Sequence, residues 1–287
     1  MEAAVIINRS KRGRDEVTAA LHEAGIDAQV EAVDGDVIRA RAEAAVEHGA
    51  RLVIVGGGDG SVSSAAQALA GTDSTLGILP LGTLNHLARD LGIPFDLADA
   101  AGLIRSGLER SIDVAEVNGR VFVNNAAIGL YPLMVLDRES QRERLGRSKR
   151  LALLIASLRT LGRFHHQRLL LSVDGGQQRV DTPLLFVGNN DYRLALPGAG
   201  RRQTLDDGKL CVMVMRRKSA PGFVAAVARA LAGRTRDDDM VRLDDVTQLR
   251  VDSARSTITL ALDGETVRMR PPLDFAIRKG ALKVITP

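Results

Sequence analysis

The chain has 287 residues, of which 45% are hydrophobic and 26% charged, and its formal net charge is +4. This composition is typical of a soluble globular protein with one large domain or two ordinary ones. The longest apolar runs are far shorter than the roughly 18 residues of a membrane span, and the first residues do not resemble a signal peptide. The single cysteine, Cys211, cannot form an internal disulfide, so we expect a reducing, cytoplasmic location.

Strand-like and helix-like segments alternate over the first 113 residues. In chain order we predict strands at 4–8, 26–33, 52–55 and 76–79, and helices at 15–24, 36–48 and 61–69. This alternation implies a parallel sheet that is covered on both faces. Ligands of such sheets bind beyond the carboxyl ends of the strands. We therefore predict an α/β, Rossmann-like N-terminal domain over residues 1–113.

The pattern changes after residue 111, where short strand-like runs are joined by tight turns. Asn118-Gly119 and Asp174-Gly175 each separate two such runs, as in β-hairpins. Further strands are predicted at 210–215, 248–252, 257–262, 266–269 and 273–277, and helices near 149–162 and 221–231. We predict a mainly antiparallel β domain over residues 114–287, with its last strand packing back on the first domain and a cleft between the domains.

The turn after the strand at 52–55 is rich in glycine and contains one carboxylate: Gly56, Gly57, Gly58, Asp59, Gly60 and Ser61. Glycines let the backbone approach a phosphate closely, and the N–H groups of the following helix point at the anion. Asp59 would repel a phosphate unless it reaches a bridging Mg²⁺. The alternative is a tight βα turn with a helix-capping aspartate. The turn is neither a P-loop nor a complete dinucleotide fingerprint.

A second polar turn follows the next predicted strand and opens a helix. Its candidate ligands are Gly82, Thr83 and Asn85, which can contact phosphate or sugar oxygens. Either polar side chain could instead be a plain helix cap. Because the two turns follow adjacent strands, we expect them to lie side by side and to form one phosphate site.

These turns and three later segments resemble the catalytic domain of diacylglycerol kinases, a family that includes sphingosine kinases and bacterial lipid kinases. Residues 57–61 are similar to the family's Gly-Gly-Asp-Gly-Thr motif, and residues 80–85 to its second nucleotide motif. The later similarities are at residues 112–129, at 205–210 and at 262–265, where the sequence reads Leu-Asp-Gly-Glu. The five motifs occur in the family's order and cover nearly the whole chain. The first turn alone also resembles NAD kinases and 6-phosphofructokinases.

The resemblance implies roles for particular residues. Asp263 would be the general base and Glu265 its neighbour in the cleft, on the same side if this segment is a strand. ATP would lie on Asn8 and the two turns, and Asp59, Asp113 and Glu265 would share a Mg²⁺. A second, structural Mg²⁺ would bind Thr204, Asp207 and the backbone carbonyl of Lys209. A hairpin turn at Asp263-Gly264 and an ordinary polar turn around Gly208 are the alternatives.

The sequence departs from the family's pattern at two places. His86 stands where many members have an aspartate, which removes one acidic group from the metal network. The segment 8–13 lacks the proline and glycine spacing of the family's first motif. The resemblance therefore implies an ATP-dependent lipid kinase of lipid metabolism that acts on diacylglycerol or a similar lipid hydroxyl. An NAD-kinase-like enzyme with a soluble acceptor, or a non-catalytic nucleotide- or lipid-binding protein, are the alternatives.

A basic segment indicates how a lipid kinase could reach its substrate. Nine Lys and Arg residues face two Glu residues between positions 138 and 168, around leucines at helical spacing. This helix could lie at the surface of an anionic membrane, or it could be a core helix with charged ends. We expect a peripheral contact with a lipid substrate and no nucleic-acid partner, because aromatic residues are only 3% of the chain. Pairing of sheet edges would allow a homodimer.

Overall fold

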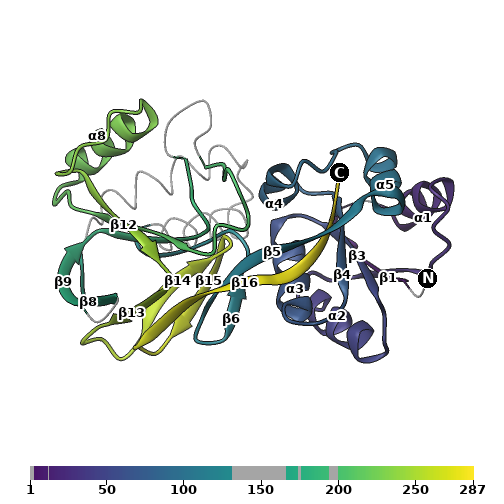
Figure 1. Cartoon of the computed structure of the whole chain (residues 1–287), viewed down its shortest axis with the longest axis horizontal. Helices are drawn as coiled ribbons and strands as arrows, with labels where there is room; N and C mark the ends of the chain where they lie inside the picture. Colours follow the sequence, from purple (N-terminus) through teal and green to yellow (C-terminus); the bar gives the residue numbers. More distant parts are fainter. Residues whose placement is uncertain (1–2, 12, 131–165, 174–175, 194–199) are drawn as a thin grey trace, which may run out of the picture.

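The structure is a computed structural model that describes residues 3–11, 13–130, 166–173, 176–193 and 200–287. The chain forms two lobes joined by two long strands (Figure 1). The first lobe contains the elements β1 (Ala3–Asn8), α1 (Arg14–Glu23), β2 (Val30–Val33), α2 (Ile38–Glu47), β3 (Leu52–Gly57), α3 (Asp59–Leu69), β4 (Thr75–Pro80), α4 (His86–Asp90) and α5 (Leu97–Ser106).

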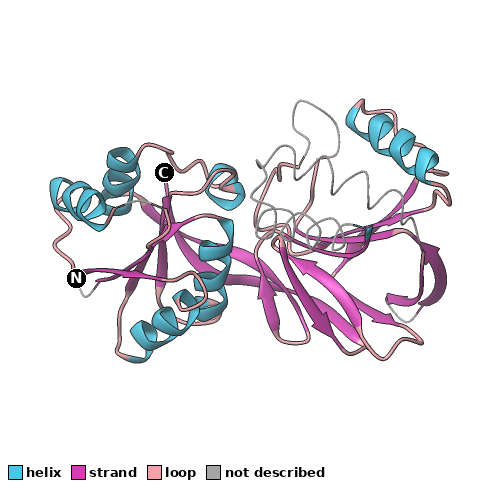
Figure 2. Cartoon of the chain, turned by 180° about the vertical axis from the view of Figure 1, so that it is seen from behind, coloured by secondary structure: helices cyan, strands magenta, loops and turns pink. Residues whose placement is uncertain are grey.

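The first lobe is a parallel sheet with helices on both sides (Figure 2). The strands run in the order β2-β1-β3-β4, and every neighbouring pair is parallel. Helices α2 and α3 pack together, as do α1 and α5. The core contains buried Val and Ile side chains from the central strands β1 and β3. The predicted α/β N-terminal part is confirmed, although β2 begins four residues later than the sequence pattern indicated.

The second lobe is built mainly from antiparallel strands. Its elements are β5 (Leu108–Val117), β6 (Arg120–Phe122), β7 (Asn125–Gly129), β8 (Gln167–Val173), β9 (Gly176–Thr182), β10 (Leu184–Asn189), β11 (Leu210–Met215), α8 (Ala220–Leu231), β12 (Met240–Val246), β13 (Gln248–Asp252), β14 (Ile258–Leu262), β15 (Glu265–Met269) and β16 (Leu273–Thr286). One sheet has the order β12-β11-β10-β7-β14-β15. It packs on the strands around β13 through a second apolar core, so the antiparallel β prediction is confirmed.

Two strands join the lobes. β16 pairs in parallel with β4 at Lys283 and Val284, antiparallel with β13 near its beginning, and antiparallel with β5 along most of its length. The predicted strand at 273–277 is therefore only the first part of a 14-residue strand. The boundary that we predict at residue 113 falls inside β5, which crosses from one lobe to the other (Figure 1). The division at 113 remains a proposal.

Local sequence signals explain the tight turns. Asn118 and Gly119 both have positive φ, and the strands on either side of them pair as a two-residue hairpin. Gly25 also has positive φ directly after α1. The helix predicted near 149–162 and the basic segment up to 165 lie outside the described residues. Among the described helices, none combines the length and the apolar composition that crossing a membrane requires.

Candidate active site

The glycine turn lies at the carboxyl end of β3, where α3 begins. Gly58 is the residue before α3, and its carbonyl oxygen accepts a hydrogen bond from the Val62 N–H. A Cβ atom at Gly57 would lie 2.3 Å from Ser61 Oγ, so a side chain cannot be placed there without moving the helix. The Ser61 hydroxyl in turn accepts a hydrogen bond from Asn8 Nδ2 at 3.3 Å. At the carboxyl end of β3, the turn therefore exposes backbone atoms rather than side chains.

The second turn, residues 80–85, lies directly against the first. A Cβ atom at Gly82 would lie 2.4 Å from the Cα atom of Gly58, and the Leu81 N–H donates to the Gly57 carbonyl oxygen. Two backbones can approach this closely only where side chains are absent. We call the two turns, residues 56–61 and 80–85, the glycine edge.

Asp59 and Asn85 hold the glycine edge together. The Asp59 carboxylate accepts hydrogen bonds from the backbone N–H groups of Asn85 at 3.1 Å and His86 at 2.6 Å, and so it caps α4. The Asn85 side chain is buried and bonds to the backbone of Pro80 and Gly82. Asn85 thus supports the turn from inside, and Thr83 is the exposed polar residue at its surface.

Asp263 lies where the two lobes meet. Its carboxylate accepts four hydrogen bonds, from the Ser63 hydroxyl on α3 and from the backbone N–H groups of Val123, Asn124 and Asn125. Burial raises the pKa of Asp263, while the four donors act in the opposite direction. A carboxylate with a raised pKa is a stronger base than an exposed one. The site therefore holds a fixed, partly desolvated carboxylate.

The segment around Asp263 is a hairpin turn rather than a continuing strand. Asp263 and Gly264 both have positive φ, and Leu262 pairs with Glu265. We expected Asp263 and Glu265 to point the same way if they alternate along a strand. That reason does not apply, because Asp263 lies in the turn. Both nevertheless approach α3, because a Cβ atom at Gly60 would lie 3.1 Å from Glu265 Oε1.

The Asp113 carboxylate is occupied by hydrogen bonds within the protein. The residue is buried in β5, and its carboxylate accepts from the Asn190 side chain at 2.8 Å and from the N–H groups of Gly208 and Gly280. The structure does not bring it to Asp59 and Glu265. Within the described residues, no three His, Cys, Asp or Glu side chains form a cluster that could hold a metal ion. The arrangement of three carboxylates around one ion is thus not seen.

The residues of the predicted structural metal site lie in the segment before β11. The Thr204 hydroxyl is buried and has no hydrogen-bond partner, whereas Asp207 is exposed. The Lys209 carbonyl oxygen already accepts a hydrogen bond from the Asn190 N–H at 3.1 Å. Oxygen atoms of this kind suit Mg²⁺ or Ca²⁺, and the unpaired Thr204 oxygen is the feature that a cation would satisfy.

An apolar cavity of about 380 Å³ lies in the second lobe. We call it the apolar cavity. Its wall consists mostly of side chains from β7, β10, β11 and α8, among them Phe186, Met213 and Ala226. Asn125, whose N–H donates to Asp263, is part of the lining, as is His86 from α4. The sequence did not reveal the cavity, because apolar residues in a strand look the same whether they face a core or a cavity.

Arg202 connects α4, the helix that follows the glycine edge, with residues that line the apolar cavity. Its side chain is fully buried, and its Nε atom lies 2.7 Å from Asp90 Oδ2 at the end of α4. The same guanidinium donates to the Val123 carbonyl oxygen and to Asn124 Oδ1, and it packs over the Tyr192 ring. Val123 and Asn124 also bind Asp263, so one arginine links α4 to the support of that carboxylate. No motif in the sequence singled out Arg202.

Comparisons with known proteins agree with this geometry. The sequence model of the diacylglycerol kinase catalytic domain matches residues 2–117, and that of the YegS C-terminal NAD kinase beta sandwich-like domain matches residues 135–286. A diacylglycerol kinase of Bacillus subtilis is 28% identical over 94% of this chain and 92% of its own length. A probable lipid kinase YegS-like protein of Pseudomonas aeruginosa is 31% identical over 99% of this chain and 93% of its own length.

Solved structures show the same fold. A diacylglycerol kinase of Bacillus anthracis aligns with 100% of this chain and 97% of its own, with a TM-score of 0.73 at 23% identity. Yeast NADH kinase aligns with 99% of this chain and 84% of its own, with a TM-score of 0.53 at 12% identity. The chain belongs to the diacylglycerol kinase catalytic-domain family and is, as a member, a phosphotransferase that acts on an alcohol group.

Proposed function

We propose that this protein transfers the γ-phosphate of ATP to the hydroxyl group of a lipid whose acyl part occupies the apolar cavity. The observation that carries the proposal is the position of Asp263. Its carboxylate is bonded on one side to Ser63 of α3, which begins at the glycine edge, and on the other to Asn125 of the cavity wall. A base at this place can reach a hydroxyl from the cavity and a phosphate on the glycine edge.

Asp263 would act as the general base. It would take the proton from the acceptor hydroxyl as the hydroxyl oxygen attacks the γ-phosphorus and the bond to the ADP oxygen breaks. The hydrogen bonds from Val123, Asn124 and Asn125 fix the carboxylate so that little reorganisation accompanies proton transfer. A positioned base typically contributes about 10²- to 10⁴-fold in rate.

The glycine edge would hold the nucleotide phosphates. The N–H groups at the start of α3 and the absence of Cβ atoms at Gly58 and Gly60 favour an anion there. Thr83 is placed to donate its exposed hydroxyl to the same phosphates. The inward-facing Asn85 would contribute by shaping the turn, since its amide is already bonded to Pro80 and Gly82.

Mg²⁺ fits the oxygen donors next to the glycine edge. Asp59 and Glu265 would hold it together with the phosphates and water, because magnesium is commonly bound through one or two carboxylates and keeps several waters. When bound, the ion neutralises charge on the transferring phosphoryl group. Asp113 is not part of this set, given its three internal hydrogen bonds.

The choice of a lipid acceptor is supported by the apolar lining of the cavity. The similarity in fold to yeast NADH kinase favours the alternative, a soluble dinucleotide acceptor. A dinucleotide carries two phosphates and two riboses, and a wall of Phe186, Met213 and Ala226 offers them few partners. The sequence relatives that are named diacylglycerol kinase and lipid kinase also favour the lipid.

One assay tests the proposal. The protein is incubated with radiolabelled ATP and Mg²⁺, and either with a panel of hydroxyl-bearing lipids in mixed micelles or with NAD. We expect label in a lipid product and none in NADP, and we expect Asp263→Asn to abolish the lipid signal. Labelling of NAD alone would overturn the lipid assignment, and full activity of Asp263→Asn would overturn the mechanism.

A further inference from the structure

Helix α8 exposes an unusual amount of apolar surface. Val224, Val227 and Leu231 are 49%, 38% and 39% exposed, and their spacing places them along one side of the helix. We call these three side chains the α8 face. The only charged residue of α8 is Arg229, and its guanidinium is turned back to the buried Asp239. The outer side of α8 therefore offers apolar groups without a free charge.

The α8 face is continuous with the apolar cavity. Ala226 and Ala230 line the cavity from the inner side of α8, and Val227 and Leu231 both line it and remain exposed. The helix is thus the wall between the cavity and the outside at this point, and it lies at the outer end of the second lobe (Figure 1). An acyl chain that enters the cavity over α8 would stay in contact with apolar groups throughout.

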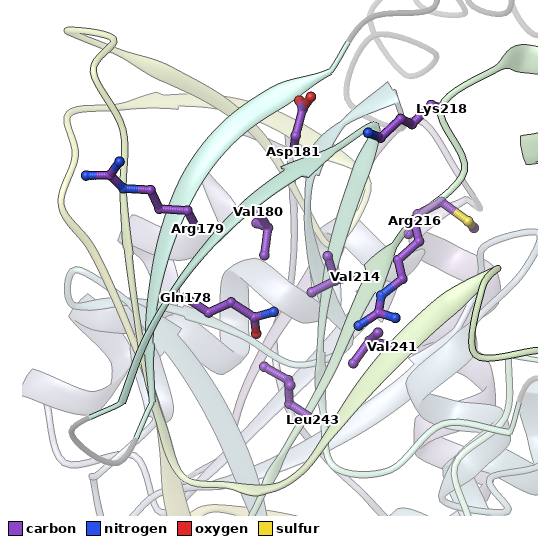
Figure 3. A pocket seen from close by; sticks show the side chains of 10 residues that line it. Gln178, Arg179, Val180, Asp181, Val214, Arg216, Lys218, Val241 and Leu243 are labelled. Carbon is purple, nitrogen blue, oxygen red and sulfur yellow. The ribbon is translucent and has the colours of Figure 1, made fainter.

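Unpaired cations flank α8 on both sides. Arg216 and Lys218 precede it, and Arg234 and Arg236 follow it together with the exposed carboxylates of Asp237 and Asp238; within the described part of the chain, none of the four cations forms an ion pair. Arg216 and Lys218, with Arg179, also rim a second cavity of about 390 Å³ whose lining includes Val180, Val214 and Val241 (Figure 3). The excess of positive charge therefore lies on the Arg216 and Lys218 side of α8, and an apolar face next to these cations is complementary to the surface of an anionic bilayer.

We infer that the α8 face docks this protein on an anionic membrane, with Val224, Val227 and Leu231 in the interface and the flanking cations on lipid phosphates. This inference rests on the proposed lipid acceptor, and it names the surface through which the enzyme contacts the membrane that contains this lipid. The sequence left open whether the basic segment 138–168 lies at the membrane surface or in the core. α8 would bring the opening of the apolar cavity to the bilayer, so that a lipid reaches Asp263 without crossing water.

The absence of tryptophan from the chain gives a direct test. Val224→Trp places a single fluorophore on the α8 face at a residue that does not line the cavity, and Leu108→Trp places one at a 70% exposed position in β5 as a matched control. With anionic vesicles, we expect a blue shift and quenching by brominated lipid for Val224→Trp alone. Unchanged emission of Val224→Trp, or equal quenching of both variants, would overturn the inference.

The charge requirement is tested by vesicle sedimentation. Each of Arg216→Gln and Lys218→Gln should lower the partition coefficient on anionic vesicles about fivefold, since one interfacial cation is worth about 1 kcal/mol. Arg51→Gln, in the first lobe, is the matched control and should change nothing. Equal binding to neutral and anionic vesicles, unaffected by salt, would contradict an anionic surface.

Measurements of lipid phosphorylation distinguish a failure of this inference from a failure of the proposed function. Val224→Glu should raise the KM for acceptor in vesicles about tenfold, the value expected for losing one buried valine side chain, and leave the rate on a dissolved short-chain diacylglycerol unchanged. Insertion of the Val224→Trp side chain without phosphorylation of any lipid would uphold the docking surface and overturn the proposed function. Phosphorylation of vesicle lipid without insertion would overturn the docking surface alone.

Discussion

The glycine edge and the apolar cavity are connected through Asp263, which bonds to Ser63 of α3 and to Asn125 of the cavity lining, yet the two are built in opposite ways. The glycine edge consists of backbone from two neighbouring turns, and a single Cβ atom at Gly82 would collide with Gly58. The apolar cavity consists of side chains from β7, β10, β11 and α8, which are far apart in the sequence. A site of backbone tolerates almost no substitution, whereas a wall of apolar side chains tolerates many of similar volume. We therefore expect substitutions to be tolerated poorly in the nucleotide site, and those in the cavity wall to change which acceptor lipid the enzyme uses.

The largest effect should come from removing the Asp263 carboxylate, which is bonded to residues on both sides. Asp263→Asn keeps the size of the side chain but removes its basicity, so kcat should fall about 10²- to 10⁴-fold. ATP binding should stay within about twofold, because Asp263 contacts α3 through Ser63 and not through the glycine edge itself. Steady-state kinetics and nucleotide titration measure the two quantities. A variant with near-normal kcat would show that Asp263 is not the base.

The next largest effect should come from breaking the buried ion pair between Arg202 and Asp90. Arg202→Met leaves Asp90 without its partner at a position where the two side chains are 0% and 6% exposed. Removing one partner of such a pair typically costs about 3–5 kcal/mol in the free energy of unfolding. Chemical denaturation should detect the loss, and kcat should fall too, because Arg202 supports Val123 and Asn124.

The matched control is an exposed arginine. Arg250 pairs with Asp274 at 3.1 Å on the surface of β13 and β16. Arg250→Met should change the free energy of unfolding by less than about 1 kcal/mol, as exposed ion pairs usually do. Equal losses in both variants would mean that the Arg202 pair has no special role.

The glycine edge and the apolar cavity also differ in how well the sequence predicts them. The glycine edge is local: a buried strand, a run of glycines and a helix follow one another, and adjacent strands place the second turn beside the first. The Asn118-Gly119 hairpin is local as well. These features follow from residues within a few positions of each other, and the sequence predicts them correctly.

Features that depend on distant residues were not predictable. Asp113 receives hydrogen bonds from Gly208 and Gly280, which are 95 and 167 positions away in the sequence. Arg202 and Asp90 are 112 positions apart. The sequence pattern predicts that a residue lies in a strand or a turn, but the direction of its side chain depends on the packing of the whole chain.

A glycine variant tests how rigid the glycine edge is. Gly82→Ala forces two backbones apart, so we expect a loss of about 1–3 kcal/mol in the free energy of unfolding and at least tenfold weaker ATP binding. Gly102→Ala in α5 is the matched control, because its Cβ atom would meet nothing within 4 Å. That variant should be neutral or stabilise the protein by about 0.5–1 kcal/mol, since alanine is favoured within a helix. Normal ATP affinity in Gly82→Ala would contradict a backbone site for the phosphates.

The smallest effect should come from the hydrogen bond that α3 gives to the base. The Ser63 hydroxyl donates to Asp263 Oδ2 at 2.6 Å and so lowers the pKa of that carboxyl against the raising effect of burial. Because the base must be deprotonated, activity should be lost as pH falls through this pKa. Ser63→Ala removes a donor to the charged form, so the pKa of Asp263 should rise and the acid limb of the kcat/KM profile should move to higher pH.

Ser64→Ala is the neighbouring control for this shift. Ser64 follows Ser63 on α3, and no hydrogen bond joins it to Asp263 in the structure. Its acid limb should coincide with that of the unchanged protein. An acid limb that stays in place in Ser63→Ala, or moves to lower pH, would assign the titration to another group. A shift in Ser63→Ala alone would show that a residue of the first lobe tunes a base that is held by Asn125 of the cavity lining. The two differently built parts would then act in one reaction.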